Sequence, residues 1–449
     1  MPKMANSQPR PPEAPARSLL ERLDAGLGNL ARKRPFQALA AAILVAFAVN
    51  AVMRAANPRR SSEFRGFRRI VQVSIVEGKD HYRTIPHIRA YPPFFAIAFA
   101  PFGLPPTALG AAFFVALSMA FAIWATWLCV QAAGGTSDPL GRAVLLFLLA
   151  GPFCLAAIAR CESDMLVVLP VAGAFHLLSR GGRGRNAAAG ALLGFAAALK
   201  LTPGVFGFYL LARRRWMALV SMAVAGVVLV AGLGTAVWGI EGNYSRHRSW
   251  YEVVARPLAR EGPTAFITRP YRGVNQSLTA ALFRFLNVKH AERLPWGSRT
   301  NVADIPARHL LDVSNILRSG LLVVFFGLWV FCGFEDRCAF ALAPLAMLFF
   351  SPLSLHTHHG VLMVSYAVAL AAIGDRQSRR ATVARWLFVL SLVLMFLTGL
   401  KAGKALSSLV ASDVVLFFAL LLLACQRMRT ARSGAGGARS ESGNGKEEK

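Results

Sequence analysis

The chain has 449 residues, of which 55% are apolar and only 16% are charged, whereas an ordinary soluble domain carries roughly 25% charged residues. The mean hydropathy is +0.47, and the apolar residues are gathered in blocks. This composition excludes a soluble enzyme, a secreted disulfide scaffold and a disordered chain. It predicts an all-α polytopic membrane protein.

A net charge of +28 is also typical of proteins that bind nucleic acid. The basic residues, however, form short runs between apolar blocks, such as Arg32–Arg34 and Arg213–Arg215. Orienting charge and attraction to anionic headgroups explain such runs, so we expect membrane lipids and no nucleic acid as partners. The six cysteines include no CxxC pair, which predicts free thiols without a disulfide or zinc site.

In chain order, residues 1–35 form a polar segment that ends in the basic run Arg32–Arg34. The apolar block 36–53 is long enough to span a membrane, and basic residues before a first span predict a cytoplasmic N-terminus. A polar loop over 54–91 follows. The first span and this loop therefore open the predicted transmembrane domain, which covers 36–425.

About a dozen apolar blocks are recognisable, which predicts a bundle of about 10–12 transmembrane helices. After the first, they are 92–104, 107–132, 140–158, 164–179, 187–211, 216–240, 317–334, 338–352, 359–374, 385–400 and 411–425. A second polar loop covers 241–315. Residues 426–449 combine Gly, Ser and charge without apolar residues to bury, which predicts a disordered tail.

Two topologies fit these blocks, and both place the loops 54–91 and 241–315 outside. Simple alternation puts the basic run Arg180–Arg185 outside, where short basic loops are disfavoured. The block 92–104 is short of the ~20 residues that a span needs. If 92–104 and 187–211 are instead re-entrant, Arg180–Arg185 lies inside and Cys161–Asp164 outside.

The first polar loop holds the densest set of candidate residues. Glu63 follows the first span closely and is flanked by arginines that include Arg68 and Arg69. A carboxylate there can accept a proton from an acceptor hydroxyl while the cations bind phosphate, although the local residues alone favour a solvated ion pair. Further along, Gly78 suits a helix stop, and the prolines after Tyr91 suit a helix start.

Other polar residues interrupt or border the apolar blocks. Glu162 and Asp164 separate two blocks and form either a polar cluster or a plain turn. Lys200 lies in the middle of the block 187–211, where an ammonium costs ~2.5–3.5 kcal/mol, so we expect it to face a cavity or a phosphate. Snorkelling would relieve that cost only if Pro203 broke the helix near the interface.

Two further motifs follow in the second half of the chain. Asn275, Gln276 and Ser277 offer hydrogen bonds to sugar hydroxyls but equally build caps and turns. His358 and His359 lie in a three-histidine segment at the boundary of an apolar block, and a histidine cluster is one indication of a metal site. With few carboxylates nearby, an imidazole aimed at a phosphate or hydroxyl fits better, and an interfacial helix start is the structural alternative.

Taken in order, these motifs resemble those of glycosyltransferase family 87, within the GT-C superfamily of membrane glycosyltransferases. The matching segments are Glu63-Phe64, Gly78-x-Asp80-x-Tyr82, Tyr91-Pro92-Pro93, Lys200-Leu201-Thr202-Pro203, Asn275-Gln276-Ser277-Leu278, and Ser351-Pro352-Leu353-Ser354 with His358-His359. Two segments depart from the family pattern. The usual Asp-Phe reads Glu63-Phe64, and the usual Gly-Gln-x-Asn reads Cys161-Glu162-Ser163-Asp164.

The resemblance implies a multi-pass enzyme of the cell membrane that transfers a hexose, typically mannose, with inversion. The donor would be a polyprenyl-phosphate sugar, and the acceptor a lipid or glycan at the outer face. Glu63 would be the catalytic base. The donor phosphate or substrates would meet Arg68, Arg69, Asp80, Tyr82, Glu162, Asp164, Lys200, Asn275, Gln276, Ser277, His358 and His359.

No cofactor and no metal are expected. A transporter or flippase of a lipid-linked sugar is the alternative, because it would share the intramembrane lysine and a basic cavity without needing a catalytic base. Inverted repeats would favour transport, and none is recognisable in the sequence.

Overall fold

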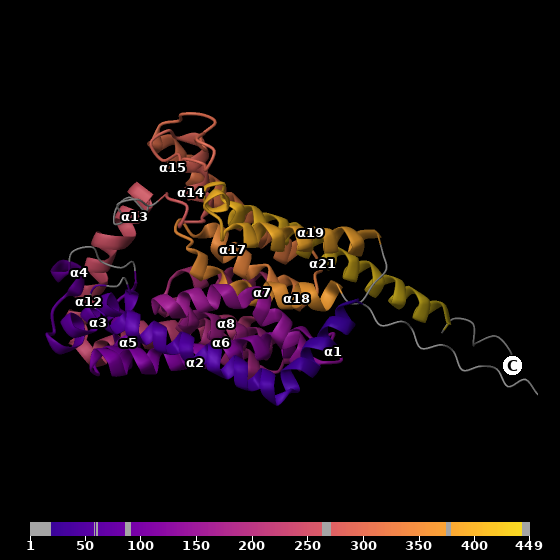
Figure 1. Ribbon diagram of the computed structural model, residues 1–449, viewed down its shortest axis with the longest axis horizontal. Helices are drawn as coiled ribbons and strands as arrows, with labels where there is room; N and C mark the ends of the chain where they lie inside the picture. Colours follow the sequence, from indigo (N-terminus) through magenta and orange to yellow (C-terminus); the bar gives the residue numbers. More distant parts are fainter. Residues whose placement is uncertain are drawn as a thin grey trace, which may run out of the picture.

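The computed structural model describes residues 19–57, 59, 62–85, 91–262, 271–373 and 379–441. Within these ranges the regular structure is helical, and β-pairing is limited to two isolated bridges, Asn275 with Leu355 and Arg293 with Arg299. In Figure 1 the helices of the first half of the chain form the lower part of the bundle, and those of the C-terminal part lie above them. The all-α fold is confirmed.

The helices of the first half include several short elements. They are α1 (Leu19–Arg32), α2 (Arg34–Ala56), α3 (Glu63–Val71), η1 (Gln72–Val76), α4 (His81–Thr84), α5 (Phe94–Gly103), α6 (Thr107–Ala133), α7 (Pro139–Arg160), α8 (Met165–Arg180), α9 (Arg183–Leu199), η2 (Thr202–Gly204) and α10 (Val205–Ala212).

The second half contains α11 (Trp216–Val227), η3 (Val228–Leu233), α12 (Gly234–Trp250), η4 (Tyr251–Ala255), α13 (Arg256–Glu261), α14 (Leu278–Leu286), α15 (Ala307–Phe331), α16 (Asp336–Ala341), α17 (Ala343–Phe350), η6 (His356–Leu362), α18 (Met363–Ile373), α19 (Arg379–Leu397), α20 (Lys401–Ala405) and α21 (Ser408–Glu441). Helix α21 thus continues into the segment 426–449 for which composition predicts disorder, and residues 442–449 lie outside the described ranges.

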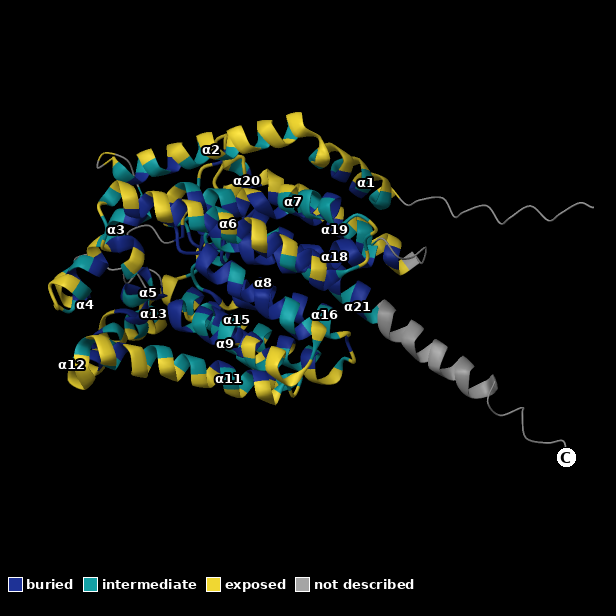
Figure 2. Cartoon of the chain, turned by 90° about the horizontal axis from the view of Figure 1, so that it is seen from below, coloured by how far each residue is buried: buried dark blue, intermediate teal, exposed yellow. Residues whose placement is uncertain are grey.

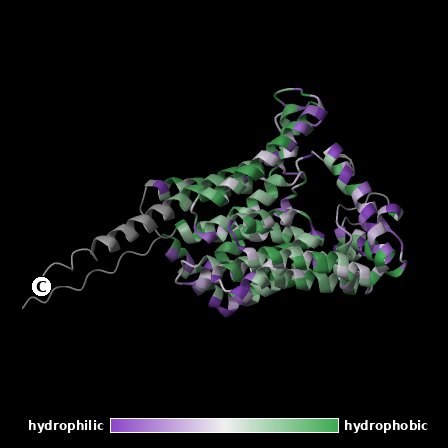
Figure 3. Cartoon of the chain, turned by 180° about the vertical axis from the view of Figure 1, so that it is seen from behind, coloured by the Kyte–Doolittle hydropathy of each residue, from purple (hydrophilic) through white to green (hydrophobic). Residues whose placement is uncertain are grey.

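Seven described helices are long and apolar enough to cross a membrane, and three more are apolar but shorter. Figure 3 shows hydrophobic residues along these helices and hydrophilic ones gathered at their ends. In Figure 2, α8 is buried at the centre, while α2 and α11 on opposite sides show exposed faces. An apolar bundle with an exposed apolar surface is what a lipid environment requires, so the polytopic prediction is confirmed.

Two sequence blocks do not correspond to single helices. The block 187–211 breaks between α9 and α10, because Pro203 in the short η2 turn lacks the backbone donor that a continuous helix needs. The block 216–240 instead continues as one helical run from Trp216 to Glu261. It passes a kink at Gly239 (φ 72°) and enters the region predicted as a loop.

Part of the first polar loop folds as an amphipathic helix. In α3, Phe64, Phe67 and Ile70 are buried, and Phe64 and Phe67 lie edge-on to Phe99 of α5 at ring distances of 5.7 and 5.2 Å. The aromatic contacts hold α3 against the bundle and fix the position of its first residue, Glu63. Gly78 (φ 66°) follows η1, as expected of a helix stop.

The helix directions distinguish the two topologies. The N-terminal end of α7 lies beside α1 through the buried Arg142–Asp24 pair (2.7 Å), so the α7–α8 turn lies at the far end. Helix α8 returns to Arg180, and α9 leads back again. The run Arg180–Arg185 is therefore at the same end as α1, and Cys161–Asp164 is at the opposite end, as the re-entrant topology predicts.

The end next to α1 collects several basic residues. Arg213 donates to Asp336 at 2.7 Å, and Arg337 donates to the carbonyl of Ala133 at the end of α6. Basic residues in the short connections between spans, such as Arg180–Arg185 and Arg213–Arg215, are expected on the cytoplasmic side. The opposite end carries the polar motifs described next.

Candidate active site

The α7–α8 turn is the centre of the candidate site. Helix α7 ends where Cys161 adopts a left-handed conformation (φ 53°), which is uncommon for a residue other than glycine. This conformation reverses the chain, so Glu162, Ser163 and Asp164 are all buried beside the start of α8. Buried carboxylates need partners, and the neighbouring helices supply them.

Asp164 is paired with Lys200 at the C-terminal end of α9. The Lys200 Nζ lies 2.9 Å from Asp164 Oδ1, and the two side chains are 17% and 6% exposed. His358 Nε2 lies 4.0 Å from the same oxygen. The break at Pro203 therefore brings Lys200 to a carboxylate, and its ammonium contacts Asp164 instead of an open phosphate site.

A cavity of about 10 Å³ adjoins this pair and is bordered by Thr202 and Ser351. Such a volume corresponds to about one water molecule. A sugar or a phosphate group does not fit there. The substrates must approach from the more exposed side of the turn.

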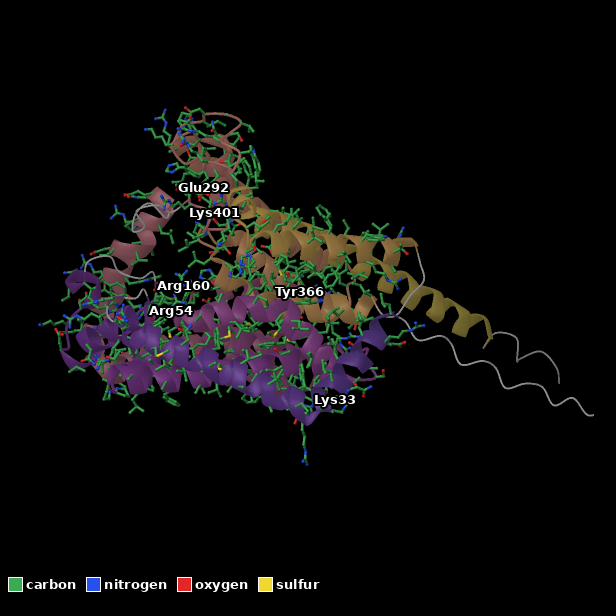
Figure 4. All side chains as sticks on the ribbon, in the orientation of Figure 1. Lys33, Arg54, Arg160, Glu292, Tyr366 and Lys401 are labelled. Atoms are coloured by element: carbon green, nitrogen blue, oxygen red, sulfur yellow. The ribbon has the colours of Figure 1, made fainter. Side chains whose placement is uncertain are left out.

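On that side, Arg160 joins two carboxylates from different parts of the chain. Its Nε lies 2.7 Å from Glu162 Oε1, and its Nη2 lies 3.8 Å from Glu63 Oε1, with side-chain exposures of 47% and 16%. In Figure 4, Arg160 and Arg54 lie close together near this turn. Arg160 is thus the accessible member of the cluster, whereas Glu63 and Glu162 are about as covered as Lys200 and Asp164.

The two acids of the turn have carboxylate oxygens within 4.8 Å of one another, so the ionisation of one disfavours the ionisation of the other. Burial raises the pKa of the Glu162 carboxyl, and the nearby Asp164 charge adds to this effect against the opposing influence of Arg160. Burial opposes ionisation of Asp164, but the nearby Lys200 and His358 outweigh it and lower the pKa of that carboxyl. The surroundings therefore raise the pKa of the Glu162 carboxyl and lower that of Asp164.

Several predicted residues of the first loop hold the loop against this turn. Asp80 caps α4 by accepting from the Tyr82 backbone N–H at 3.0 Å, and Tyr82 Oη donates to the Tyr91 carbonyl at 2.6 Å. Ser163 in turn donates to Tyr91 Oη at 3.0 Å. Asp80 and Tyr82 are therefore connected to the site through Tyr91.

The two arginines predicted to meet phosphate have other partners. Arg68 donates to the Pro105 carbonyl at 3.2 Å. Arg69 pairs with Glu77 at 2.7 Å. The structure does not bring either residue to the Glu63–Arg160 cluster.

Asn275 and Ser277 contact the segment that precedes the histidines. Asn275 Oδ1 accepts from the Ser354 N–H at 3.0 Å, and Ser277 Oγ donates to the Pro352 carbonyl at 2.9 Å. Gln276 donates to the Lys404 carbonyl at 3.0 Å. All three side chains are buried; Asn275 and Ser277 hold the 352–354 segment that leads into His358, to which Gln276 contributes its backbone N–H, bonded to the Ser354 carbonyl.

The adjacent histidines of η6 face different surroundings. His358 faces Asp164, whereas the fully buried His359 has its Nε2 3.0 Å from Asp413 Oδ2 of α21. Residues of a 3₁₀-helix follow one another at three per turn, so neighbours diverge by a third of a turn. Only His358 lies beside the α7–α8 turn.

Glu162, Asp164 and His358 offer ligand atoms within 4.8 Å of one another, close enough for one metal ion. The Lys200 ammonium already supplies positive charge at Asp164. Any cation there would compete with Lys200 for the carboxylate.

Sequence reasoning did not single out Arg160 or Asp413. Arg160 could have been found from its position, because it is a charged residue at the end of an apolar block and only two positions before Glu162. Asp413 inside the last apolar block was another, because an intramembrane carboxylate needs a partner.

The site has a basic, carboxylate-lined centre at one end of a membrane helix bundle. This arrangement fits a transferase. The model of glycosyltransferase family 87 matches residues 90–353, so the chain belongs to that family and is a membrane glycosyltransferase. Among solved structures, the chain is similar to ArnT from Cupriavidus metallidurans bound to undecaprenyl phosphate. Identity is 16%, coverage is 90% of this chain and 79% of that chain, and the TM-score is 0.35. No curated protein matches the chain.

Proposed function

We propose that this glycosyltransferase transfers a hexose, mannose in particular, from a polyprenyl-phosphate donor to a lipid or glycan acceptor, with inversion. We place the reaction at the outer face of the cell membrane. The observation that carries the proposal is the cluster of Glu63, Arg160 and Glu162 above the Lys200–Asp164 pair. It combines a carboxylate and an accessible cation at one end of the bundle.

A lipid-linked donor suits this geometry. Its polyprenyl tail can lie along exposed apolar helix faces such as that of α2, where Val45, Val49 and Met53 are exposed. That helix ends beside Arg54 and Glu63. Arg160 is the cation best placed to meet the donor phosphate, because guanidinium groups bind phosphate oxygens through paired hydrogen bonds.

In this mechanism Glu63 is the base. It takes the proton of the acceptor hydroxyl as that oxygen attacks the anomeric carbon and the bond to the donor phosphate breaks. Arg160 stabilises the leaving phosphate, and the ion pair with Asp164 keeps Lys200 close beneath it. A direct contact between Lys200 and the phosphate requires the Lys200–Asp164 pair to open.

The remaining predicted contacts have different support. His358 lies next to Asp164 and is the histidine that we assign to the site. Asn275, Gln276 and Ser277 would act by holding the 352–354 segment. Arg68, Arg69 and His359 would need new partners to reach a substrate.

The test is transfer of a labelled hexose from a polyprenyl-phosphate donor by the purified protein. Glu63→Gln keeps the size and removes the charge, so turnover should fall by ~10²–10⁴-fold, the usual contribution of a positioned proton acceptor. Donor binding should persist. Glu63→Asp should retain part of the activity.

Glu77→Gln is the matched control, because Glu77 lies in the same loop and pairs at the surface with Arg69 and Lys79, whereas Arg160 pairs with Glu63 and Glu162. Normal turnover of Glu63→Gln would move the base to Glu162 or Asp164. Movement of the labelled donor across the membrane without transfer would instead support the flippase alternative.

A further inference from the structure

A second hollow lies apart from the Lys200–Asp164 pair. It has a volume of about 830 Å³ and is formed by residues 271–274, residues 289–293 and α20. Figure 4 shows Glu292 and Lys401 close together in this region, above Arg160. The volume falls in the range of ordinary ligand sites, roughly 300–1,000 Å³.

The wall of this basic hollow carries far more positive than negative charge. Its charged residues are Arg272, Lys289, Arg293, Lys401, Lys404 and Glu292. The single carboxylate, Glu292, accepts a hydrogen bond from the Gly273 backbone N–H. Among the described residues, none of the five cations forms an ion pair, so their mutual repulsion favours the binding of an anion.

The hollow is built by a close approach of two segments. A Cβ on Gly273 would lie 3.0 Å from the Lys404 Cβ and 3.1 Å from Glu292 Oε2. Gln276 donates to both the Gly273 and Lys404 carbonyls. These contacts hold α20 and its two lysines against the second polar loop.

Its position suits a lipid headgroup. Helix α20 connects the spanning segments Arg380–Leu397 and Ser408–Cys425, so Lys401 and Lys404 lie within a few residues of two membrane spans. The hollow is also at the active-site end of the bundle, because Gln276 donates to the Lys404 carbonyl and the adjacent Ser277 donates to the Pro352 carbonyl in the segment that leads into His358. A molecule anchored in the membrane can therefore reach the hollow and the site together.

We propose that the basic hollow binds the phosphate of the acceptor, and that the acceptor is a lipid with an anionic, phosphate-bearing headgroup. The assignment to the acceptor rests on the proposed function, whereas the anion site itself does not. The donor phosphate meets Arg160 at the α7–α8 turn. The acceptor phosphate is held by Lys401 and Lys404, which leaves its headgroup hydroxyls free to reach Glu63.

Binding is measured without donor or turnover, by native mass spectrometry of the purified full chain with phosphatidylglycerol or phosphatidylcholine. We expect the wild type to retain phosphatidylglycerol preferentially. Lys401→Gln with Lys404→Gln should weaken that retention roughly ten- to thirtyfold, because each lysine near a phosphate surface contributes about a factor of five. Both lysines are exposed, so thermal unfolding should be unchanged.

The matched control is Arg183→Gln with Arg185→Gln, which removes two exposed charges at the opposite end of the bundle. Equal losses in the two double variants, or no lipid preference in the wild type, would overturn the proposal. Displacement of the lipid by millimolar inorganic phosphate would assign the site to free phosphate and overturn the proposal that it binds a lipid headgroup.

A kinetic arm tests the assignment to the acceptor. The Lys401→Gln/Lys404→Gln variant should raise KM for a phosphate-bearing lipid acceptor at least tenfold and leave KM for the donor unchanged. An equal rise in the KM for the donor would refute the acceptor assignment. If no donor supports transfer, the proposed function fails while the binding result still stands.

Discussion

The Lys200–Asp164 pair gives the most quantitative prediction about this protein. At 2.9 Å between Nζ and Oδ1, the attraction is about 6 kcal/mol with an effective dielectric constant of ~20. The cost of removing both groups from water offsets much of it, but removal of one partner leaves a buried charge uncompensated. Lys200→Met should therefore lower the free energy of unfolding by about 3–5 kcal/mol.

The assay is unfolding of the purified protein in mixed micelles, with a double-mutant cycle. Because Lys200→Met/Asp164→Asn removes both charges, it should recover at least half of the loss caused by Lys200→Met alone. Lys79→Met is the control, since the Lys79–Glu77 pair is largely exposed and its loss should leave unfolding unchanged. Additive single effects at positions 200 and 164 would refute a buried, coupled pair.

Three further predictions concern topology, the second loop and pH. Cysteines introduced at Lys79 and Lys289 should react with an impermeant maleimide in intact cells, and one at Arg183 only after permeabilisation; the reverse pattern would contradict an outer site. Asn275→Ala removes the acceptor for the Ser354 N–H and should cost about 1–3 kcal/mol of stability together with turnover; full turnover would show that His358 does not need this support. The pKa of Glu162 is raised by burial and by Asp164, so its folded state binds the proton more tightly, and stability should fall as pH rises above about 4.5 toward the raised pKa. Glu162→Gln should abolish this fall in stability with pH, and an unchanged pH profile of stability in the variant would contradict a raised pKa of Glu162.

The sequence by itself determined the class of protein and the order of its motifs. Hydropathy is a local property, since each span must bury its own backbone in lipid, so apolar blocks are visible without a fold. The helix stop at Gly78 and the helix start after Tyr91 were likewise predictable, because both depend on local backbone geometry. The family motifs could be recognised because their residues are contiguous.

Tertiary structure decided which of those residues meet. Lys200 and Asp164 are 36 positions apart and become partners only because α8 and α9 are antiparallel and Pro203 ends the run after α9. Arg160 links Glu63 to Glu162 because aromatic packing places α3 beside the α7–α8 turn. The free energy of these charged groups depends on burial and on partners distant in sequence, and local patterns contain neither quantity.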